Sequence, residues 1–297
     1  MSTELETRTE RAEVVHGAPA PETHPLPELE IKPPGRFSGV GLREIWAYRE
    51  LLYFLTKREL QIRYKQSYLG FGWAILQPVA LAFIFALFFG RLAGLSSEGI
   101  PYPVFALGGL VPWIFTSGAV TGATGSLVTD ANLIGKVYFP RATIPVAKML
   151  SLVIDLVVAF VFLIVFALAY GVHLHWTTVA IPAFVLLDFA IVLGVGLYLS
   201  ALNVRYRDVF VAVPLLMQLW LFVSPVVYSG VLVTGAWQYV YALNPMASVL
   251  TGFRWALFGT HSPGLGPTLV STGVALLLLL AGSLYFRRVE NYFADVI

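Results

Sequence analysis

Apolar residues form long runs along most of the chain, and polar residues gather in the segments between them. Each run has roughly the 20 residues that an α-helix needs to cross about 30 Å of hydrocarbon. We therefore predict an all-α, polytopic membrane protein with six transmembrane helices. The second run contains Gly108, Gly109 and Pro112, which we expect to interrupt its helix. The predicted spans are residues 69–92, 102–127, 143–171, 177–200, 208–228 and 267–286.

The connection between the last two spans is too apolar to lie wholly in water. Asn244 followed by Pro245 is a favourable helix start, and Gly259 is a plausible stop. The roughly 14 residues between them would extend only about 21 Å, and Arg254 would be costly in a full crossing. We therefore predict that residues 231–258 form a re-entrant pair of helices beside a pore, because broken backbone at that depth needs protein or water around it.

Basic residues are strongly biased to one side of this topology. With the amino terminus inside, the outer loops carry only Arg91 and Arg254. The positive-inside rule then places both termini in the cytoplasm. A rival topology, with residues 231–258 as a seventh span, would put the 287–288 arginine pair outside. The twelve inner cations are Arg43, Arg49, Lys57, Arg58, Arg63, Lys65, Lys136, Arg141, Arg205, Arg207, Arg287 and Arg288.

The chain ahead of the first span divides into two parts. Residues 1–38 combine seven acids, four cations and six prolines with few apolar residues, and we predict a disordered cytoplasmic tail. Residues 39–68 form an interfacial region, and residues 69–297 form the six-span domain. Within the interfacial region, residues 41–55 have apolar positions at helical spacing, with Trp46 and Tyr53 as anchors. An ordinary soluble helix is the alternative for this segment.

The stretch 56–78 joins a cationic half to the start of the first apolar run. Thr56 followed three residues later by Glu59 is a capping-box signal, which predicts that a helix starts there. This helix would follow the cytoplasmic surface and turn into the bilayer near Gly70 and Gly72.

The connection between the second and third spans, residues 129–141, reads TDANLIGKVYFPR. Its residues Leu133, Ile134, Val137 and Tyr138 would share one helical face, and Pro140 would end the helix. We predict a short amphipathic helix exposed to the cytoplasm, which either docks a partner or lies in the interface alone.

Composition narrows the class of protein. The chain is 58% hydrophobic, only 12% charged and free of cysteine, which excludes disulfides and thiolate metal sites. The first 30 residues have no apolar core, so we expect no secretory signal peptide. No Walker motif, HExxH, GxSxG or histidine cluster is present. We therefore expect a protein that moves or anchors something, with neither ATP hydrolysis nor nucleic-acid binding of its own.

Three ionisable residues fall inside the predicted spans: Lys148, Asp155 and Asp188. Intramembrane charge is costly and marks a functional hypothesis. Lys148 and Asp155 share a helical face but lie about 10 Å apart along the axis, so each needs another partner. The two aspartates would either form a proton relay or bond neighbouring helices.

From about residue 42 to residue 297 the sequence resembles the permease subunit of polysaccharide-exporting ABC transporters, the group that exports O-antigen, teichoic acid, capsule or galactan. Several ordered motifs carry this resemblance. They are KRELQIRYKQSYLGFGWAILQP, FFGRLAGL, PYPVFALGGLVPW, NLIGKVYFPR, LNVRYRDV, SPVVYS, LNPMASVLTGFRWALFG and FRRVENYFADVI.

The resemblance implies a six-span permease in the bacterial cytoplasmic membrane that works as a homodimer. Two separately encoded ATPase subunits would dock below it and hold the ATP and Mg, with no cofactor on this chain. The substrate would be a glycan on a polyprenyl diphosphate lipid. The ATPase-coupling helix would be residues 132–139, with Asn132, Leu133, Ile134, Lys136, Val137, Tyr138 and Phe139. The outer gate would be residues 231–258, with Asn244, Pro245, Phe253, Arg254 and Trp255.

Two further sets of residues suit such a substrate. Arg58, Arg63, Tyr64 and Lys65 could bind a diphosphate at the inner interface, since arginine binds phosphate bidentately. The same cations could instead only orient the protein and attract anionic lipids. Aromatic faces along a channel would stack on sugar rings, although aromatic residues also form interfacial belts. The channel candidates are Trp113, Phe115, Trp220 and Phe222.

Three other functions are alternatives to the hypothesis of a polysaccharide export permease. The same architecture could export a drug or a small lipid, and only the detailed motifs argue against that. A secondary carrier could use Asp155 and Asp188, and it would transport without an ATPase. A membrane enzyme of glycan assembly would need converging catalytic groups, which the sequence does not offer.

Overall fold

The computed structural model describes residues 42–65, 67–134 and 139–290, and all regular structure in these ranges is helical. The prediction of an all-α chain is confirmed for this part of the protein. The predicted tail, residues 1–38, lies outside the described residues. Within the described ranges, five helical stretches are long and apolar enough to cross a membrane: Gly72–Leu92, Tyr102–Thr129, Thr143–Ala169, Trp176–Arg205 and Leu265–Glu290. The fifth predicted span, 208–228, contains only the shorter apolar helix Asp208–Val223.

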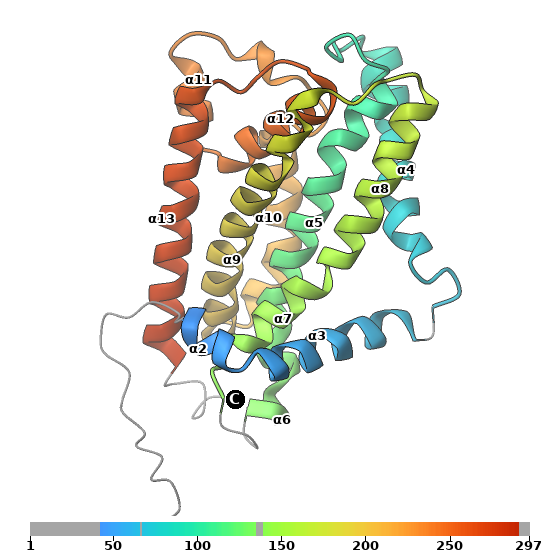
Figure 1. Cartoon of the computed structure of the whole chain (residues 1–297). Coiled ribbons are helices and arrows are strands. Elements are labelled where there is room, and N and C mark those ends of the chain that lie inside the picture. The colour runs from blue at the N-terminus through green and yellow to red at the C-terminus, as the bar shows by residue number, and fades with distance from the viewer. Residues whose placement is uncertain (1–41, 66, 135–138, 291–297) are drawn as a thin grey trace, which may run out of the picture. The chain divides into compact units, whose positions relative to one another are not determined.

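The helices follow one another closely along the chain (Figure 1). They are α2 (Leu42–Ala47), α3 (Arg49–Tyr64), α4 (Gly72–Phe85), the π-helix η1 (Ala86–Leu92), α5 (Tyr102–Thr129), α6 (Ala131–Ile134), α7 (Thr143–Ser151), α8 (Val153–Ala169), the 3₁₀ helix η2 (Trp176–Ala180), α9 (Ile181–Arg205), α10 (Asp208–Val223), the 3₁₀ helix η3 (Gly230–Leu232), α11 (Trp237–Tyr241), α12 (Pro245–Phe258) and α13 (Leu265–Glu290).

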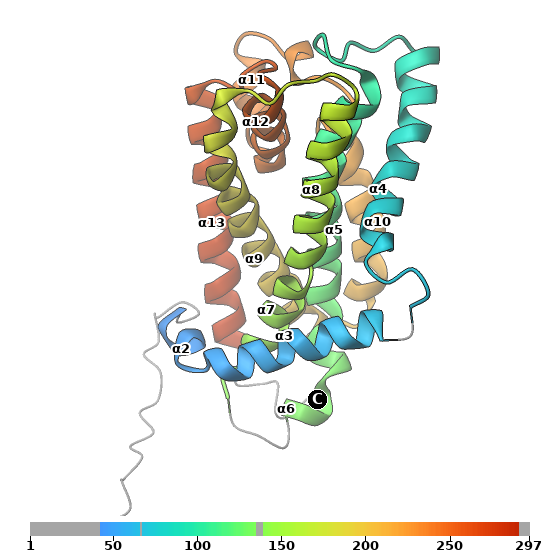
Figure 2. The same cartoon turned by 45° about the vertical axis from the view of Figure 1, so that its right-hand side comes forward.

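The long helices form a bundle with α3 lying across one end and α11 and α12 at the other (Figures 1 and 2). We call these the α3 end and the α12 end. Helix α5 is the centre of the bundle: it packs against α4, α7, α8, α9, α10 and α12, and most of its residues are buried. Helices α4, α10 and α13 instead leave many large apolar side chains exposed, as expected for surfaces that face lipid.

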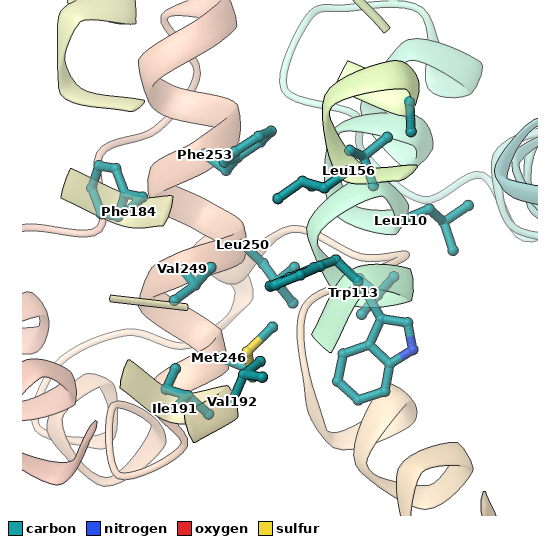
Figure 3. Close-up of a cluster of buried hydrophobic side chains, with 14 of the residues drawn as sticks. Leu110, Trp113, Leu156, Phe184, Ile191, Val192, Met246, Val249, Leu250 and Phe253 are labelled. Carbon is teal, nitrogen blue, oxygen red and sulfur yellow. The ribbon is translucent and has the colours of Figure 1, made fainter. Parts of the chain in front are cut away.

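Helix α12 contributes directly to the hydrophobic core. Its residues Met246, Val249, Leu250 and Phe253 are almost fully buried and meet side chains of α5, α8 and α9 (Figure 3). Burying side chains of this size is worth about 1.5–3 kcal/mol each in water, and close packing supplies the contact energy within lipid. Helix α12 is therefore an integral part of the bundle.

Helices α9 and α13 cross at a pair of glycines, Gly194 and Gly282. A Cβ atom added to Gly282 would overlap the Gly194 carbonyl, and one added to Gly194 would lie 2.5 Å from the Leu279 nitrogen. The two backbones can approach this closely only because neither position carries a side chain.

We expect Gly282→Ala to lower the free energy of unfolding by about 1–3 kcal/mol, because the new methyl group must push α9 and α13 apart. Gly273→Ala on the same helix is the matched control, since nothing lies within 4 Å of the Cβ it would add. It should be neutral or stabilise by up to about 1 kcal/mol through helix propensity. Thermal unfolding of the detergent-solubilised protein measures both, and equal melting temperatures for the two variants would contradict the tight crossing.

The capping-box prediction at Thr56 was wrong. Helix α3 begins at Arg49, and the Thr56 hydroxyl lies inside it and donates to the Leu52 carbonyl at 2.7 Å. The amphipathic segment 41–55 also divides at Tyr48 into α2 and α3. The predicted turn before the first span is confirmed, since α3 ends at Tyr64 and α4 begins at Gly72.

The predicted interruption of the second span was also wrong. Helix α5 runs unbroken through Gly108, Gly109 and Pro112, because a single proline removes only one backbone hydrogen bond. The third span instead divides at Leu152 into α7 and α8. The two glycines serve packing: a Cβ on Gly109 would lie 2.5 Å from the Val226 carbonyl oxygen.

Candidate functional site

Helix α3 is fastened to the bundle by a chain of ion pairs centred on Glu59. Arg58 Nη2 lies 2.5 Å from Asp130 Oδ1 and 3.1 Å from Glu59 Oε1. Lys148 Nζ, from α7, donates to the other carboxylate oxygen of Glu59. We call these four residues the Glu59 cluster. Because Asp130 caps the end of α5, the cluster ties α3 to both α5 and α7.

Glu59 is buried although it lies on an interfacial helix. Burial by itself raises the pKa of its carboxyl, but the hydrogen bonds and charges of Lys148 and Arg58 outweigh burial and lower the pKa below its ordinary value. Burial likewise opposes the charge of Arg58, and Glu59 and Asp130 together raise the pKa of its guanidinium. The cluster therefore favours its charged form.

The lowered pKa of Glu59 predicts that α3 loosens in acid. A carboxyl whose native pKa is depressed stabilises the fold above its ordinary pKa, about 4.3, and loses that contribution as the pH falls through the native value. We expect hydrogen exchange of the α3 amides, corrected for intrinsic rates, to accelerate below about pH 4. Glu59→Gln should exchange fast already at neutral pH. Glu50→Gln, an exposed acid of the same helix, is the control, and a wild-type response in Glu59→Gln would disprove the assignment.

A second cluster lies further along α3. Arg63 Nη1 donates to Asp155 Oδ2 at 2.7 Å, and the Tyr64 hydroxyl donates to Asp155 Oδ1. Burial, followed by this bond to the carboxylate, raises the pKa of Tyr64 to about 12, so its hydroxyl remains a donor. Lys148 and Asp155 thus have separate partners on α3, which confirms the prediction that each needs one.

The Arg63–Tyr64–Asp155 cluster forms part of the wall of a groove of about 440 Å³, which we call the α3 groove. Helices α4, α5 and α8 supply most of its remaining walls, and Gln77 adds a polar side chain. Besides Tyr64, three aromatic residues share this lining: Trp73, Trp113 and Phe115. A cation, a hydroxyl donor and aromatic faces therefore border one space.

The structure places the other predicted diphosphate-binding residues and channel aromatics outside the lining of the α3 groove. Arg58 belongs to the Glu59 cluster, and Lys65 is exposed; neither lines the groove. The Trp220 ring meets the Trp113 ring edge to face at 5.8 Å, and its Nε1 donates to Asn244 Oδ1 at 2.9 Å. Phe222 is exposed on α10, outside the groove. Of the four predicted channel aromatics, only Trp113 and Phe115 line the groove.

At the α12 end, the chain leaves α10 at Val223 and continues through segment 224–229 without regular helix. Side chains from other elements bond the carbonyl oxygens of this segment. Arg254 donates from Nη2 to the Pro225 carbonyl and from Nη1 to the Tyr228 carbonyl, and the Tyr102 hydroxyl donates to the Val227 carbonyl. Buried backbone that leaves a helix needs partners of this kind.

Arg254 lies at the centre of this arrangement. It is 2% exposed, and its Cζ lies 4.0 Å from the centroid of the Phe105 ring. Gly108 makes room for it, since a Cβ there would lie 2.9 Å from Arg254 Cγ. No acid lies within ion-pair distance among the described residues, so carbonyl oxygens and an aromatic face solvate the guanidinium.

The predicted bounds of α12 are confirmed. Asn244 caps the helix by accepting from Met246 N at 3.2 Å, Pro245 is its first residue, and Gly259 ends it with φ of +67°. The Asn244 amide also donates to the Ser224 hydroxyl at 2.9 Å. The other predicted gate residues lie inside the bundle, with Phe253 buried and Trp255 edge to face with the Phe184 ring.

Asp188 is buried in α9 and accepts a hydrogen bond from the Thr116 hydroxyl of α5 at 2.6 Å. Asp155 bonds instead to Arg63 and Tyr64 of α3. The two aspartates share no partner in the described part of the chain. Each joins two helices, which is the structural alternative to a proton relay.

The predicted coupling segment is described only in part. Helix α6 covers residues up to Ile134, and Lys136, Val137 and Tyr138 lie outside the described residues. Asn132 is exposed, and Leu133 is half-buried against the core. Phe139 is 5% exposed and packs within this chain's own core, so the structure does not present it to a partner.

Sequence reasoning missed three acidic partners. Glu59 was assigned to a helix cap, and neither Asp130 nor Glu98 was predicted to be a partner of another residue. The signal for the first two was the number of cations in residues 57–65, which is more than an interfacial helix can bury without acids from its neighbours. No three histidine, aspartate or glutamate side chains gather as a metal site would require in the part of the chain that the structure describes.

Comparison with known proteins identifies the class. Residues 50–258 match the ABC-2 type transporter family model, and the chain therefore belongs to this family. It is 32% identical to the O-antigen export system permease protein RfbA of Myxococcus xanthus, over 86% of this chain and 98% of the relative. It is 27% identical to RfbA of Klebsiella pneumoniae, over 84% and 95%, and 23% identical to the polysialic acid transport protein KpsM of Escherichia coli, over 80% and 92%. The resemblance drawn from the sequence motifs is confirmed.

Proposed function

We propose that the chain is the permease subunit of an ATP-driven exporter that moves a polyprenyl-diphosphate-linked polysaccharide across the bacterial cytoplasmic membrane. It works as a homodimer with two copies of a separately encoded ATPase, which hold the ATP and Mg. The names of its relatives, export permeases for O-antigen and polysialic acid, support a polysaccharide as cargo. The observation that carries the proposal is the α3 groove, which combines a cation with aromatic walls.

The groove suits both ends of such a substrate. Arg63 offers planar donors to a diphosphate, and the Tyr64 hydroxyl offers another. A diphosphate would compete with Asp155 for both groups, so Arg63 would keep an anionic partner. The displaced Asp155 carboxylate would have to take up a proton or turn away from the groove, because it would otherwise face the diphosphate unpaired. Trp73, which is exposed, supplies a flat apolar face on which sugar rings stack and slide.

The ATPase docks at the α3 end through segment 132–139. The α6 helix extends beyond α3 at this end of the bundle (Figure 2). Asn132 supplies an exposed position. Phe139 and the backbone nitrogen of Arg141, which donates to Glu290 Oε1 at 2.9 Å, attach the end of the segment to the bundle. Movement of the ATPase is thereby transmitted to α13.

Depletion of the chain tests the function. We would switch off its synthesis, label the envelope glycans, and locate the diphosphate-lipid-linked polymer. Accumulation on the cytoplasmic side with loss from the cell surface is the expected result, and it would identify the glycan. Unchanged surface glycans would remove this proposal and favour export of a drug or small lipid.

The orientation is testable because the chain has no cysteine. We expect a membrane-impermeant maleimide to label Thr234→Cys, exposed at the α12 end, in intact spheroplasts. Asn132→Cys, exposed on α6, should react only after permeabilisation. The reverse pattern would show that the α3 end faces outward and would exclude ATPase docking there.

A further inference from the structure

A second cavity lies at the α12 end, between η3, α11, α12 and the loop that precedes α13. Its volume is about 320 Å³, within the range of small-molecule sites. Helix α12 contributes only small side chains to it, Ala247, Ser248 and Thr251, and this leaves the space open. The facing walls come from Gln238 and Tyr241 of α11 and from residues 261–264.

Three polar side chains in this cavity have no partner among the described residues. The Gln238 amide, the Thr251 hydroxyl and the His261 imidazole form no hydrogen bond with any residue that the structure describes. By contrast, the hydroxyl of Tyr241 pairs with Tyr228 at 2.7 Å, and that of Ser248 pairs with Ser271 at 2.7 Å. Each of the three unengaged groups can both donate and accept hydrogen bonds.

A carboxylate outside the lining connects two sides of the cavity. Glu98 accepts from the Ser229 hydroxyl on one side and from the His261 backbone nitrogen, at 2.7 Å, on the other. The backbone of Glu98 has φ of +55°, a left-handed conformation that residues other than glycine rarely adopt. One carboxylate thus fixes two walls, and a preformed site loses little ordering entropy on binding.

We propose that this cavity binds a neutral sugar residue of the exported glycan. A sugar hydroxyl both donates and accepts, which matches the three unengaged side chains. The lining contains no Asp, Glu, Lys or Arg, so it offers a diphosphate no counter-charge. A purely apolar ligand would leave the three polar groups unpaired. The α3 groove, with its charged pair, and this cavity therefore recognise different parts of one substrate. The inference rests on the proposed function for the identity of the sugar.

Direct binding tests the inference. The probe is a set of neutral oligosaccharides released by mild acid from the surface polysaccharide of the producing cell and labelled at the reducing end. We expect the purified permease–ATPase complex to bind them, and Gln238→Leu and Thr251→Val each to weaken binding about three- to tenfold. Thr234→Val is the matched control, because Thr234 is exposed near the cavity but does not line it. Equal affinity in all four proteins, or no binding to the wild type, would overturn the inference.

Chemical protection gives a second measurement that does not depend on the stability of those variants. Thr251→Cys introduces the chain's single thiol into the cavity. The oligosaccharides should slow its modification by a methanethiosulfonate reagent severalfold, and an unchanged rate would count against the site.

The depletion experiment identifies the exported cargo and does not depend on this cavity. The binding experiment measures the affinity of the cavity for oligosaccharides and does not depend on transport. Loss of surface glycan on depletion together with no binding would remove only the sugar site. Unchanged surface glycan would remove the proposed function whatever the cavity binds.

Discussion

Replacing Arg254 with methionine is expected to destabilise the α12 end and to reduce export at least tenfold. The substitution keeps the length of the side chain but removes the donors to the Pro225 and Tyr228 carbonyls. Each buried carbonyl left unpaired costs about 1–3 kcal/mol. Removal of a buried charge offsets part of this cost, and we expect a net loss of about 2–4 kcal/mol. The lost contact with the Phe105 ring adds to it.

Two companion variants make the test specific. Arg254→Lys keeps the charge but cannot span both carbonyls with a planar fork, so it should fall between methionine and the wild type. Arg91→Met removes an exposed arginine and should behave as the wild type. Melting temperature of the solubilised protein and surface glycan in complemented cells are the two readouts. Wild-type stability and export in Arg254→Met would show that segment 224–229 is held by other contacts.

Exchanging the charges of Arg63 and Asp155 is expected to separate their structural role from substrate binding. Arg63→Ala leaves Asp155 with only the Tyr64 hydroxyl and removes the cation from the groove, so we expect export to fall about 10–100-fold. The double variant Arg63→Asp, Asp155→Arg restores an ion pair across the same two helices. Its free energy of unfolding should return to within about 1 kcal/mol of the wild type, while export stays low because the donors have moved away from Tyr64.

Lys57→Ala is the matched control for this series, since Lys57 is an exposed cation of the same helix with no partner among the described residues. This variant should leave both the free energy of unfolding and the export of glycan unchanged. Recovery of export in the double variant would mean that Arg63 acts only through the ion pair, and the assignment of Arg63 to a diphosphate would then be wrong.

Local chemistry explains why some elements were predicted well. Asn244, Pro245 and Gly259 set the bounds of α12 through contacts within one turn of the helix, and these contacts can be read from neighbouring residues. The same logic failed at Thr56, because the amphipathic face of α3 begins earlier and packing overrides a weak cap. Helix α10 was predicted too long for a related reason: segment 224–229 leaves the helix to meet Arg254 and Tyr102.

The candidate site was predicted in fragments. Arg63, Tyr64, Trp113 and Phe115 were each proposed from residue type, in two separate sets, and only the structure brings them to one groove. Trp73 and Gln77 line the same groove, but they lie in the first apolar run and were not predicted as site residues. Whether a side chain faces a groove depends on the rotation of its helix against its neighbours, and hydrophobic runs without a polar face do not specify that rotation.

The sequence alone predicted the class of protein, the apolar spans, the excess of basic residues on one side and the family. These features depend on hydrocarbon thickness, on the cost of desolvating charge and on the order of short motifs, and each can be read from residues close together in the chain. Tertiary structure decided which charges neutralise one another. Glu59 pairs with Lys148, which is 89 positions away in the sequence, and Asp155 pairs with Arg63, which is 92 positions away. It also decided that Arg254 is solvated by carbonyl oxygens, that one groove contains an ion pair and that a second cavity is lined by uncharged residues. These pairings depend on distances of a few ångströms between packed helices, and such distances exist only once the bundle has formed.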